Sequence, residues 1–234
     1  MALRKWAACL SRAVVVAMTL MIGTWSGARA DSAASSSIWS NLPAWDVPSN
    51  FVYFSPTNLT NWRFGAYGGQ INQARLLSIE WSPWSDVNKF SHGYMAALDA
   101  TVNLVKTPYL PITIGVDLNV SQHFGQQTYY EVAAAPTVTW DWFPWNNYVY
   151  TRYRIGPLGG SYDTALSRSE ATETSTGKTS RFLNYHVSEW IFSPSKDSKW
   201  EVFIGVHHRC GIYGLIDHVD GGENYVTAGW RAGF

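Results

Sequence analysis

The feature that most constrains the fold is a two-residue alternation of apolar and polar side chains in segments about ten residues long. In residues 112–121, isoleucine, valine and leucine alternate with threonine, aspartate and asparagine. Successive side chains of a β-strand point to opposite faces, so this alternation predicts strands with one apolar and one polar face. The same pattern occurs in 94–104, 130–142, 148–158, 200–210 and 224–234, and less regularly in 182–192.

The composition indicates which face points outward. Only 15% of the 234 residues are charged, against about a quarter in soluble domains, whereas aromatic residues also reach 15%. Tryptophan and tyrosine are typical of surfaces that meet the lipid–water boundary. The polar faces carry Asp, Glu, Arg, Thr and Asn but almost no Lys, which suits a narrow interior where carboxylates pair with arginines. We therefore expect an all-β transmembrane barrel rather than a soluble periplasmic β protein, and the zero net charge gives no indication of a nucleic-acid partner.

The N-terminal residues are typical of an export signal. Arg4 and Lys5 precede an apolar core at 13–25, and Ala28-Arg29-Ala30 matches a small-x-small cleavage site. The apolar core is too short for a good membrane-spanning helix. We expect residues 1–30 to be a Sec-type signal peptide, cleaved near Ala30. The mature chain then has Cys210 as its one cysteine, so no internal disulfide is possible.

Three regions follow from this pattern. Residues 31–61 are rich in Ser, Pro and Asn and predict an irregular lead-in, and residues 62–234 predict the barrel. The chain ends in Phe234 with apolar residues at alternate positions before it, which resembles the C-terminal signal of bacterial outer-membrane barrels. The predicted location is the bacterial outer membrane.

The direction of the last strand fixes the topology. If 224–234 descends to the periplasm, residues 143–147 form a short periplasmic turn and 161–181 form a long extracellular loop, as is usual for these barrels. Seven segments show the alternation, and an even count needs one more. Either 62–70 or 75–83 supplies it, giving eight strands, whose narrow interior is filled by side chains.

A candidate site lies near the end of the penultimate strand. His208 and Cys210 are two residues apart, on the same predicted outward face as Trp200. Ionisable groups at a lipid boundary are costly and often functional. A nucleophile next to a base, with a group that orients the base, is the arrangement that ester cleavage needs. Structural alternatives remain open: His208 as a boundary aromatic and Cys210 as a small apolar residue.

The final hairpin resembles the lipid A 3-O-deacylases of the PagL type. That family has a His-x-Ser motif near the top of the penultimate strand and a glutamate about a dozen residues later. Here His208-Arg209-Cys210 matches the first part with cysteine in place of serine, and Glu223 stands near the acid. The resemblance extends loosely over 94–234. It implies an eight-stranded barrel whose site faces the outer leaflet.

The resemblance also implies roles. Cys210 would be the nucleophile, His208 the base and Glu223 its orienting acid. Gly211 replaces an asparagine that the family uses for the oxyanion, so the donor there would be a backbone N–H. Strand parity places Glu223 on the face opposite His208 unless the backbone is irregular, and the alternative for Glu223 is a solvated loop residue.

The predicted function is hydrolysis of an ester-linked 3-hydroxyacyl chain of lipid A, the lipid of lipopolysaccharide, by a carboxylic ester hydrolase without a cofactor. The alternative is a non-catalytic barrel that stabilises the envelope or adheres through the loop 161–181. A transport barrel is disfavoured by the strand count. The sequence does not indicate an oligomeric state.

Other polar residues of the last hairpin have structural explanations. We expect His207 and Arg209 to point inward and to join a network with Glu201 or Arg231. No metal site is expected, because the spacing of the three loop donors is a weak match to one: Asp217, His218 and Asp220.

Overall fold

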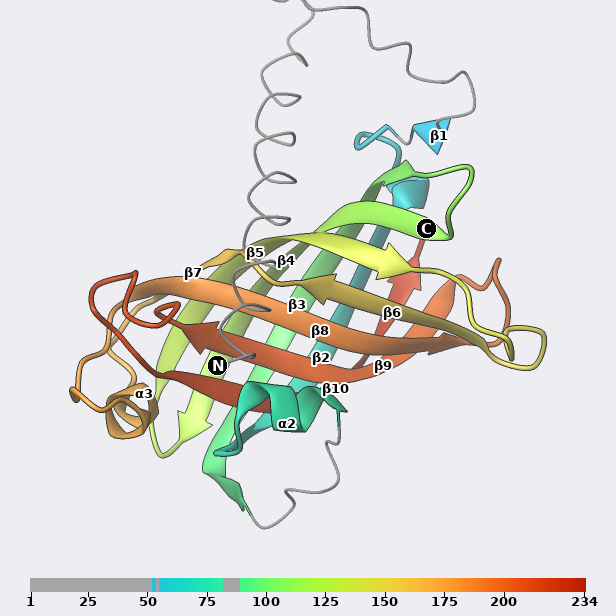
Figure 1. Cartoon of the computed structure of the whole chain (residues 1–234). Coiled ribbons are helices and arrows are strands. Elements are labelled where there is room, and N and C mark those ends of the chain that lie inside the picture. Colours follow the sequence, from blue (N-terminus) through green and yellow to red (C-terminus); the bar gives the residue numbers. More distant parts are fainter. Residues whose placement is uncertain (1–51, 54, 82–88) are drawn as a thin grey trace, which may run out of the picture. The chain divides into compact units, whose positions relative to one another are not determined.

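The described chain folds as a closed antiparallel β-barrel in a computed structural model that covers residues 52–53, 55–81 and 89–234 (Figure 1). The predicted signal peptide lies outside the described residues, as does most of the lead-in. The elements in chain order are β1 (Val52–Tyr53), η2 (Leu59–Asn61), β2 (Trp62–Asn72), α2 (Leu76–Trp81), β3 (Phe90–Lys106), β4 (Ile112–Gly125), β5 (Tyr129–Trp140), β6 (Tyr150–Gly156), β7 (Gly160–Asp163), α3 (Arg168–Glu173), β8 (Phe182–Ser193), β9 (Trp200–Cys210) and β10 (Gly222–Gly233).

The sheet closes because its last strand pairs with its first long one. From β2 to β5 each strand pairs antiparallel with the next, β8, β9 and β10 do the same, and β10 returns to β2. β6 and β7 together occupy one position between β5 and β8, and β1 only extends the edge of β3. The predicted eight-stranded barrel is therefore confirmed.

The open choice of the first strand is resolved in favour of the earlier segment. Residues 62–70 lie in β2, whereas residues 76–81 of the other candidate form α2. In the described part of the predicted lead-in, Val52–Tyr53 pairs with β3 and residues 59–61 form a 3₁₀ turn.

The two faces of the wall have the polarity that the alternation predicts. Along β5, odd-numbered residues are buried and even-numbered residues are mostly exposed. Large apolar side chains remain exposed on the outer face, including Leu98, Val120, Val132, Trp200 and Trp230. An apolar outer wall around a polar interior is the arrangement of a barrel that spans a membrane. None of the described helices is long and apolar enough to cross one.

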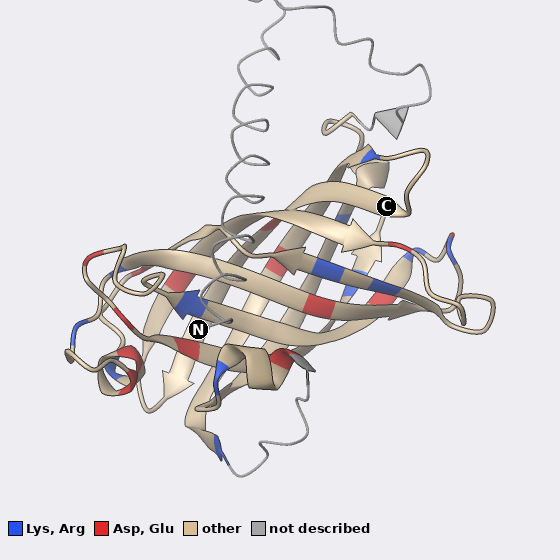
Figure 2. Cartoon of the chain, viewed as in Figure 1, with Lys and Arg blue, Asp and Glu red and all other residues tan. Residues whose placement is uncertain are grey.

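The interior is filled by large side chains and paired charges. Figure 2 shows acidic and basic positions along the strands as well as in the loops. The Arg231 guanidinium binds Glu189 at 2.6 Å and also pairs with Asp99, while Arg154 pairs with Glu189. These side chains are almost completely shielded from solvent. Buried charges are tolerated only in such pairs, so the arginines and carboxylates belong to the packing of the barrel.

One part of the outer wall departs from this pattern. On β8, outward residues 184, 186 and 188 are buried, as are Val206 and His208 on β9. Ile79 and Ala74 of the segment between β2 and β3 pack against Val206. α2 therefore covers an area of wall that would otherwise meet lipid.

Candidate functional site

Two histidines stand side by side on the covered area of the outer wall. His208 of β9 is paired in register with His186 of β8, and their ring centroids are 6.0 Å apart, edge to face. Both side chains point away from the interior because they have the same parity as the outward residues of their strands. The structure therefore places His208 on the predicted face and adds His186 beside it.

The backbone of the neighbouring strand holds the His208 ring. Its Nδ1 lies 3.1 Å from the carbonyl oxygen of Glu223. Because a carbonyl only accepts, Nδ1 must carry the hydrogen, and the Nε2 of the neutral ring keeps a lone pair. His208 therefore has the tautomer that a general base needs.

Cys210 lies at the end of β9 as a free, partly buried thiol. Its sulfur is 4.0 Å from the Nδ2 of Asn184, the residue opposite it on β8. Within the described part of the chain no hydrogen bond joins Cys210 to His208. The two predicted partners thus share a face without being engaged with each other.

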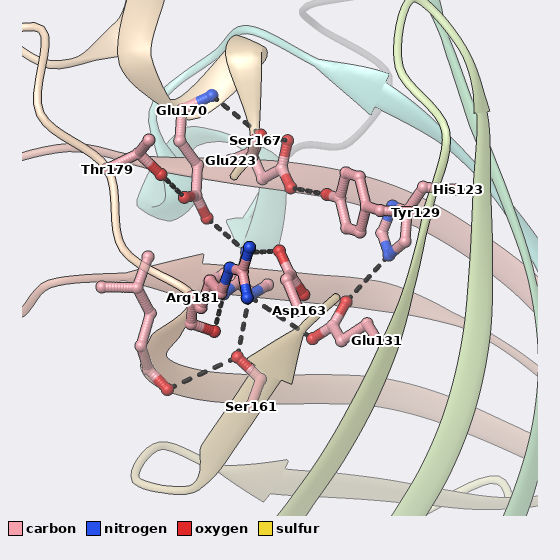
Figure 3. Close-up of polar contacts among 12 residues, drawn as sticks. His123, Tyr129, Glu131, Ser161, Asp163, Ser167, Glu170, Thr179, Arg181 and Glu223 are labelled. Carbon is pink, nitrogen blue, oxygen red and sulfur yellow. Dashed lines mark hydrogen bonds and ion pairs between the residues drawn. The ribbon is translucent and has the colours of Figure 1, made fainter. Parts of the chain in front are cut away.

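The Glu223 carboxylate is not beside His208. It points into the barrel, where it accepts a hydrogen bond from Tyr129 at 2.6 Å (Figure 3). It also accepts hydrogen bonds from Gln127 at 3.1 Å and from Ser167 at 3.1 Å. Strand parity is the reason: residues 223 and 208 have opposite parity on paired strands. Glu223 contacts the imidazole only through its backbone carbonyl.

The Gly211 amide also has a partner. Its N–H donates to the carbonyl oxygen of Gly221 at 3.3 Å. A Cβ at this position would lie 2.1 Å from the carbonyl oxygen of Val219. The close approach of these two backbone segments therefore requires glycine.

Sequence reasoning did not identify the acidic residue that does lie at the histidine pair. The Glu80 carboxylate of α2 is 2.6 Å from Nε2 of His186. Burial acts to raise the pKa of Glu80, but the hydrogen bond and charge of His186, with the nearby Ser188 hydroxyl, lower it below its ordinary value. No local pattern indicates Glu80, because it reaches a residue 106 positions later through the packing of α2.

A groove runs from this cluster along the outer wall beneath α2. It has a volume of about 470 Å³ and is lined mainly by apolar side chains of α2 and of six strands. Glu80 and Ser188 lie in its lining, whereas the rest includes Ile79, Trp190, Ile204 and Val226.

A second polar network fills the barrel interior at the end that carries the long loops (Figure 3). Arg209 pairs there with Asp163, with Glu170 at 2.8 Å and with Glu131 at 3.5 Å. His207 and His123 both bind the Glu131 carboxylate. His207 and Arg209 point inward as predicted, but their partners are not the predicted ones, since β5, β7 and α3 supply the acids.

The described ranges contain no group of three or more His, Cys, Asp or Glu side chains arranged to hold a metal ion. In the loop after β9, where the sequence spacing is only a weak match to a metal site, Asp217 and His218 both have positive φ.

No protein-family model matches the chain, and no curated protein matches it. Several solved structures are similar to the chain, among them three at low sequence identity. The outer membrane enzyme PagL is 12% identical with a TM-score of 0.49, covering 74% of this chain and 99% of that chain. Neisserial surface protein A is 11% identical with a TM-score of 0.42, covering 74% and 97%. LpxR from Salmonella typhimurium is 10% identical with a TM-score of 0.29, covering 62% and 54%.

Proposed function

We propose that this barrel lies in the bacterial outer membrane and hydrolyses an ester-linked 3-hydroxyacyl chain of lipid A. The observation that carries the proposal is the cluster on the outer wall, where two histidines, a thiol and a carboxylate occupy one area of a largely apolar surface. Such groups are costly at a lipid-facing surface and have no need to be there for the barrel to close.

The proposed chemistry assigns roles to His208, Cys210, the main-chain carbonyl of Glu223 and the N–H of Gly211. Nε2 of His208 takes the proton of the Cys210 thiol, and the thiolate attacks the ester carbonyl carbon. The alcohol leaves with that proton, and water then hydrolyses the thioester to release the fatty acid. The carbonyl of Glu223 keeps the imidazole in the required tautomer. The N–H of Gly211 would release the carbonyl oxygen of Gly221 and donate to the oxyanion instead.

The thiol and imidazole must come together for this reaction. Same-face neighbours on a strand are close enough for a side-chain rotation to join them, and catalytic hydrogen bonds often tighten only when substrate binds. The substrate ester would approach from the surrounding leaflet, so lipopolysaccharide is the expected partner.

The mass of lipid A tests the proposal. Wild-type protein, expressed in a host with unmodified lipid A, is expected to remove one 3-hydroxyacyl chain. His208→Ala is expected to restore the parent mass, while the exposed loop variant His218→Ala serves as the matched control and behaves like wild type. Unaltered lipid A in cells that contain folded wild-type barrel would contradict the proposal.

One observation favours a second function, a non-catalytic structural or adhesive barrel. His186, His208 and Cys210 each have a partner within the protein, and both histidines are nearly buried. A satisfied polar cluster can simply fasten α2 to the wall. Under this alternative, His208→Ala lowers the stability of the folded barrel. Lipid A keeps its parent mass with wild type and with every variant.

A further inference from the structure

The groove beneath α2 is closed on one side by the helix and on the other by the barrel. Ile79 contributes from α2 and Phe90 from the start of β3, while Trp190, Ile204 and Val226 contribute from the wall. The groove is continuous with the outer face that carries the exposed apolar residues of the barrel. Its surroundings are therefore hydrocarbon rather than water.

The polarity of the groove is uneven. Glu80 and Ser188 supply polar groups in a lining that is otherwise largely apolar. Glu80 is bound to His186, which stands next to His208. The apolar space therefore begins at the cluster to which the proposed function assigns the chemistry.

We propose that this groove binds the acyl chain of the ester substrate, with the ester group at the histidine pair and the hydrocarbon between α2 and the wall. The inference rests on the proposed function and adds the part of the protein that selects the chain. An acyl chain is the one long apolar ligand that a lipid-facing groove meets at high concentration, and its polar end would meet Glu80 and the histidines.

Small residues keep the groove open. Gly68 of β2 and Ala228 of β10 lie in its lining and are both exposed. A Cβ built on Gly68 has its nearest neighbour at 3.7 Å, the carbonyl oxygen of Met95, which is an ordinary van der Waals distance. A larger side chain at position 68 is therefore compatible with the backbone and would project into the groove.

Gly68→Phe tests the inference, with Ala134→Phe as a matched control on the exposed outer face of β5, outside the groove. In vesicles of purified lipopolysaccharide, Gly68→Phe should lower kcat/KM by at least about ten-fold, mainly through KM, and shift the preference toward shorter acyl chains. Ala134→Phe should stay within about two-fold of wild type. If wild type is active and Gly68→Phe keeps its rate and chain preference, the groove assignment is overturned while the proposed function stands.

A second measurement does not depend on hydrolysis. A fatty acid with a diazirine on its tail, photoactivated in the same vesicles, should label groove residues such as Ile79 and Trp190 saturably, and Gly68→Phe should abolish that labelling. Uniform, non-saturable labelling around the whole wall would overturn the inference. If wild type leaves lipid A intact, the proposed function fails, and the labelling pattern alone then decides whether the groove takes an acyl chain.

Discussion

Arg209 is the cation around which the polar interior at the long-loop end is organised. Its guanidinium reaches Asp163, Glu170 and Glu131, and Nε donates to Ser161 at 2.7 Å. All of these side chains are shielded from solvent. Removing one charge from such a group leaves its partners buried without compensation, which is more costly than losing an exposed pair.

Arg209→Met is therefore expected to lower the free energy of unfolding by about 3–5 kcal/mol. Urea unfolding of the barrel in lipid vesicles measures the change. Arg168→Met is the control, because Arg168 is exposed at the start of α3 and its replacement should cost little. Equal stabilities of the two variants would show that the buried carboxylates around Arg209 do not need its charge for compensation.

For Glu223 the structure predicts a contribution to stability, whereas the sequence resemblance implies that its carboxylate orients His208. Its carboxylate accepts hydrogen bonds from Tyr129, Gln127 and Ser167 inside the barrel. Glu223→Ala should lower the free energy of unfolding by about 1–3 kcal/mol, because these donors lose their acceptor. The exposed Glu173→Ala is the matched control. The His208 contact uses the main-chain carbonyl, so wild-type-like lipid hydrolysis is expected once the folded fraction is taken into account.

At the scale of residues, the sequence predicts the directions of three side chains of the candidate site but not the presence of Glu80. Alternation alone places His208 and Cys210 outward and Glu223 inward, since parity follows from the strand. Glu80 was not predictable, because no periodicity relates a helix in one loop to His186 on a distant strand. Its position depends on how α2 packs against the wall.

At the scale of elements, the strands were predictable where apolar and polar residues alternate strictly. Segment 112–121 became β4, and 200–210 coincides with β9. The first strand was ambiguous because β2 is rich in glycine and small residues, which leave little alternation to detect. Segment 148–158 is interrupted, and β6 and β7 share its position.

α3 connects the long loop between β7 and β8 to the barrel interior. Ser167 caps the helix by accepting from the N–H of Glu170, and the Glu170 carboxylate binds Arg209 and Thr179. Burial raises the pKa of Glu170 to about 8; Arg209 opposes this shift and the negative charge of Glu223 adds to it. Ionisation of Glu170 therefore costs more free energy in the folded protein than in the unfolded chain.

The pH dependence of stability follows from that shift. A carboxyl group with a raised pKa in the folded state contributes most below its unfolded pKa of 4.5, and this contribution is lost as the pH rises through about 8. Urea unfolding at pH 5 and at pH 8.5 measures this loss. The free energy of unfolding should decrease less between the two pH values for Glu170→Gln than for wild type, because glutamine does not ionise. Equal decreases in the two proteins would contradict the assignment to Glu170.

For the whole molecule, the distribution of polarity is reversed relative to a soluble domain. The interior holds the charged layers around Arg209 and Arg231, and the outer face exposes leucine, valine and tryptophan. The paired interior charges let the narrow barrel be filled without a hydrocarbon core. The hydrophobic surface is stabilised by lipid, so the fold and its membrane setting depend on each other.

Leu98→Arg tests this dependence directly. Leu98 lies on β3 with its side chain 71% exposed on the outer wall, whereas Leu215 is 79% exposed in the loop that follows β9. In a soluble protein both substitutions would be nearly neutral. On a lipid-facing wall, arginine at position 98 should lower the free energy of unfolding in vesicles by up to about 2–4 kcal/mol, with the largest effect at the midplane, while Leu215→Arg should change it little. The two variants isolate the contribution of hydrocarbon, because they introduce the same charge at positions of similar exposure. Equal and small effects at both positions would mean that the wall around Leu98 faces water, and the lipid-directed site built on that wall would lose its basis.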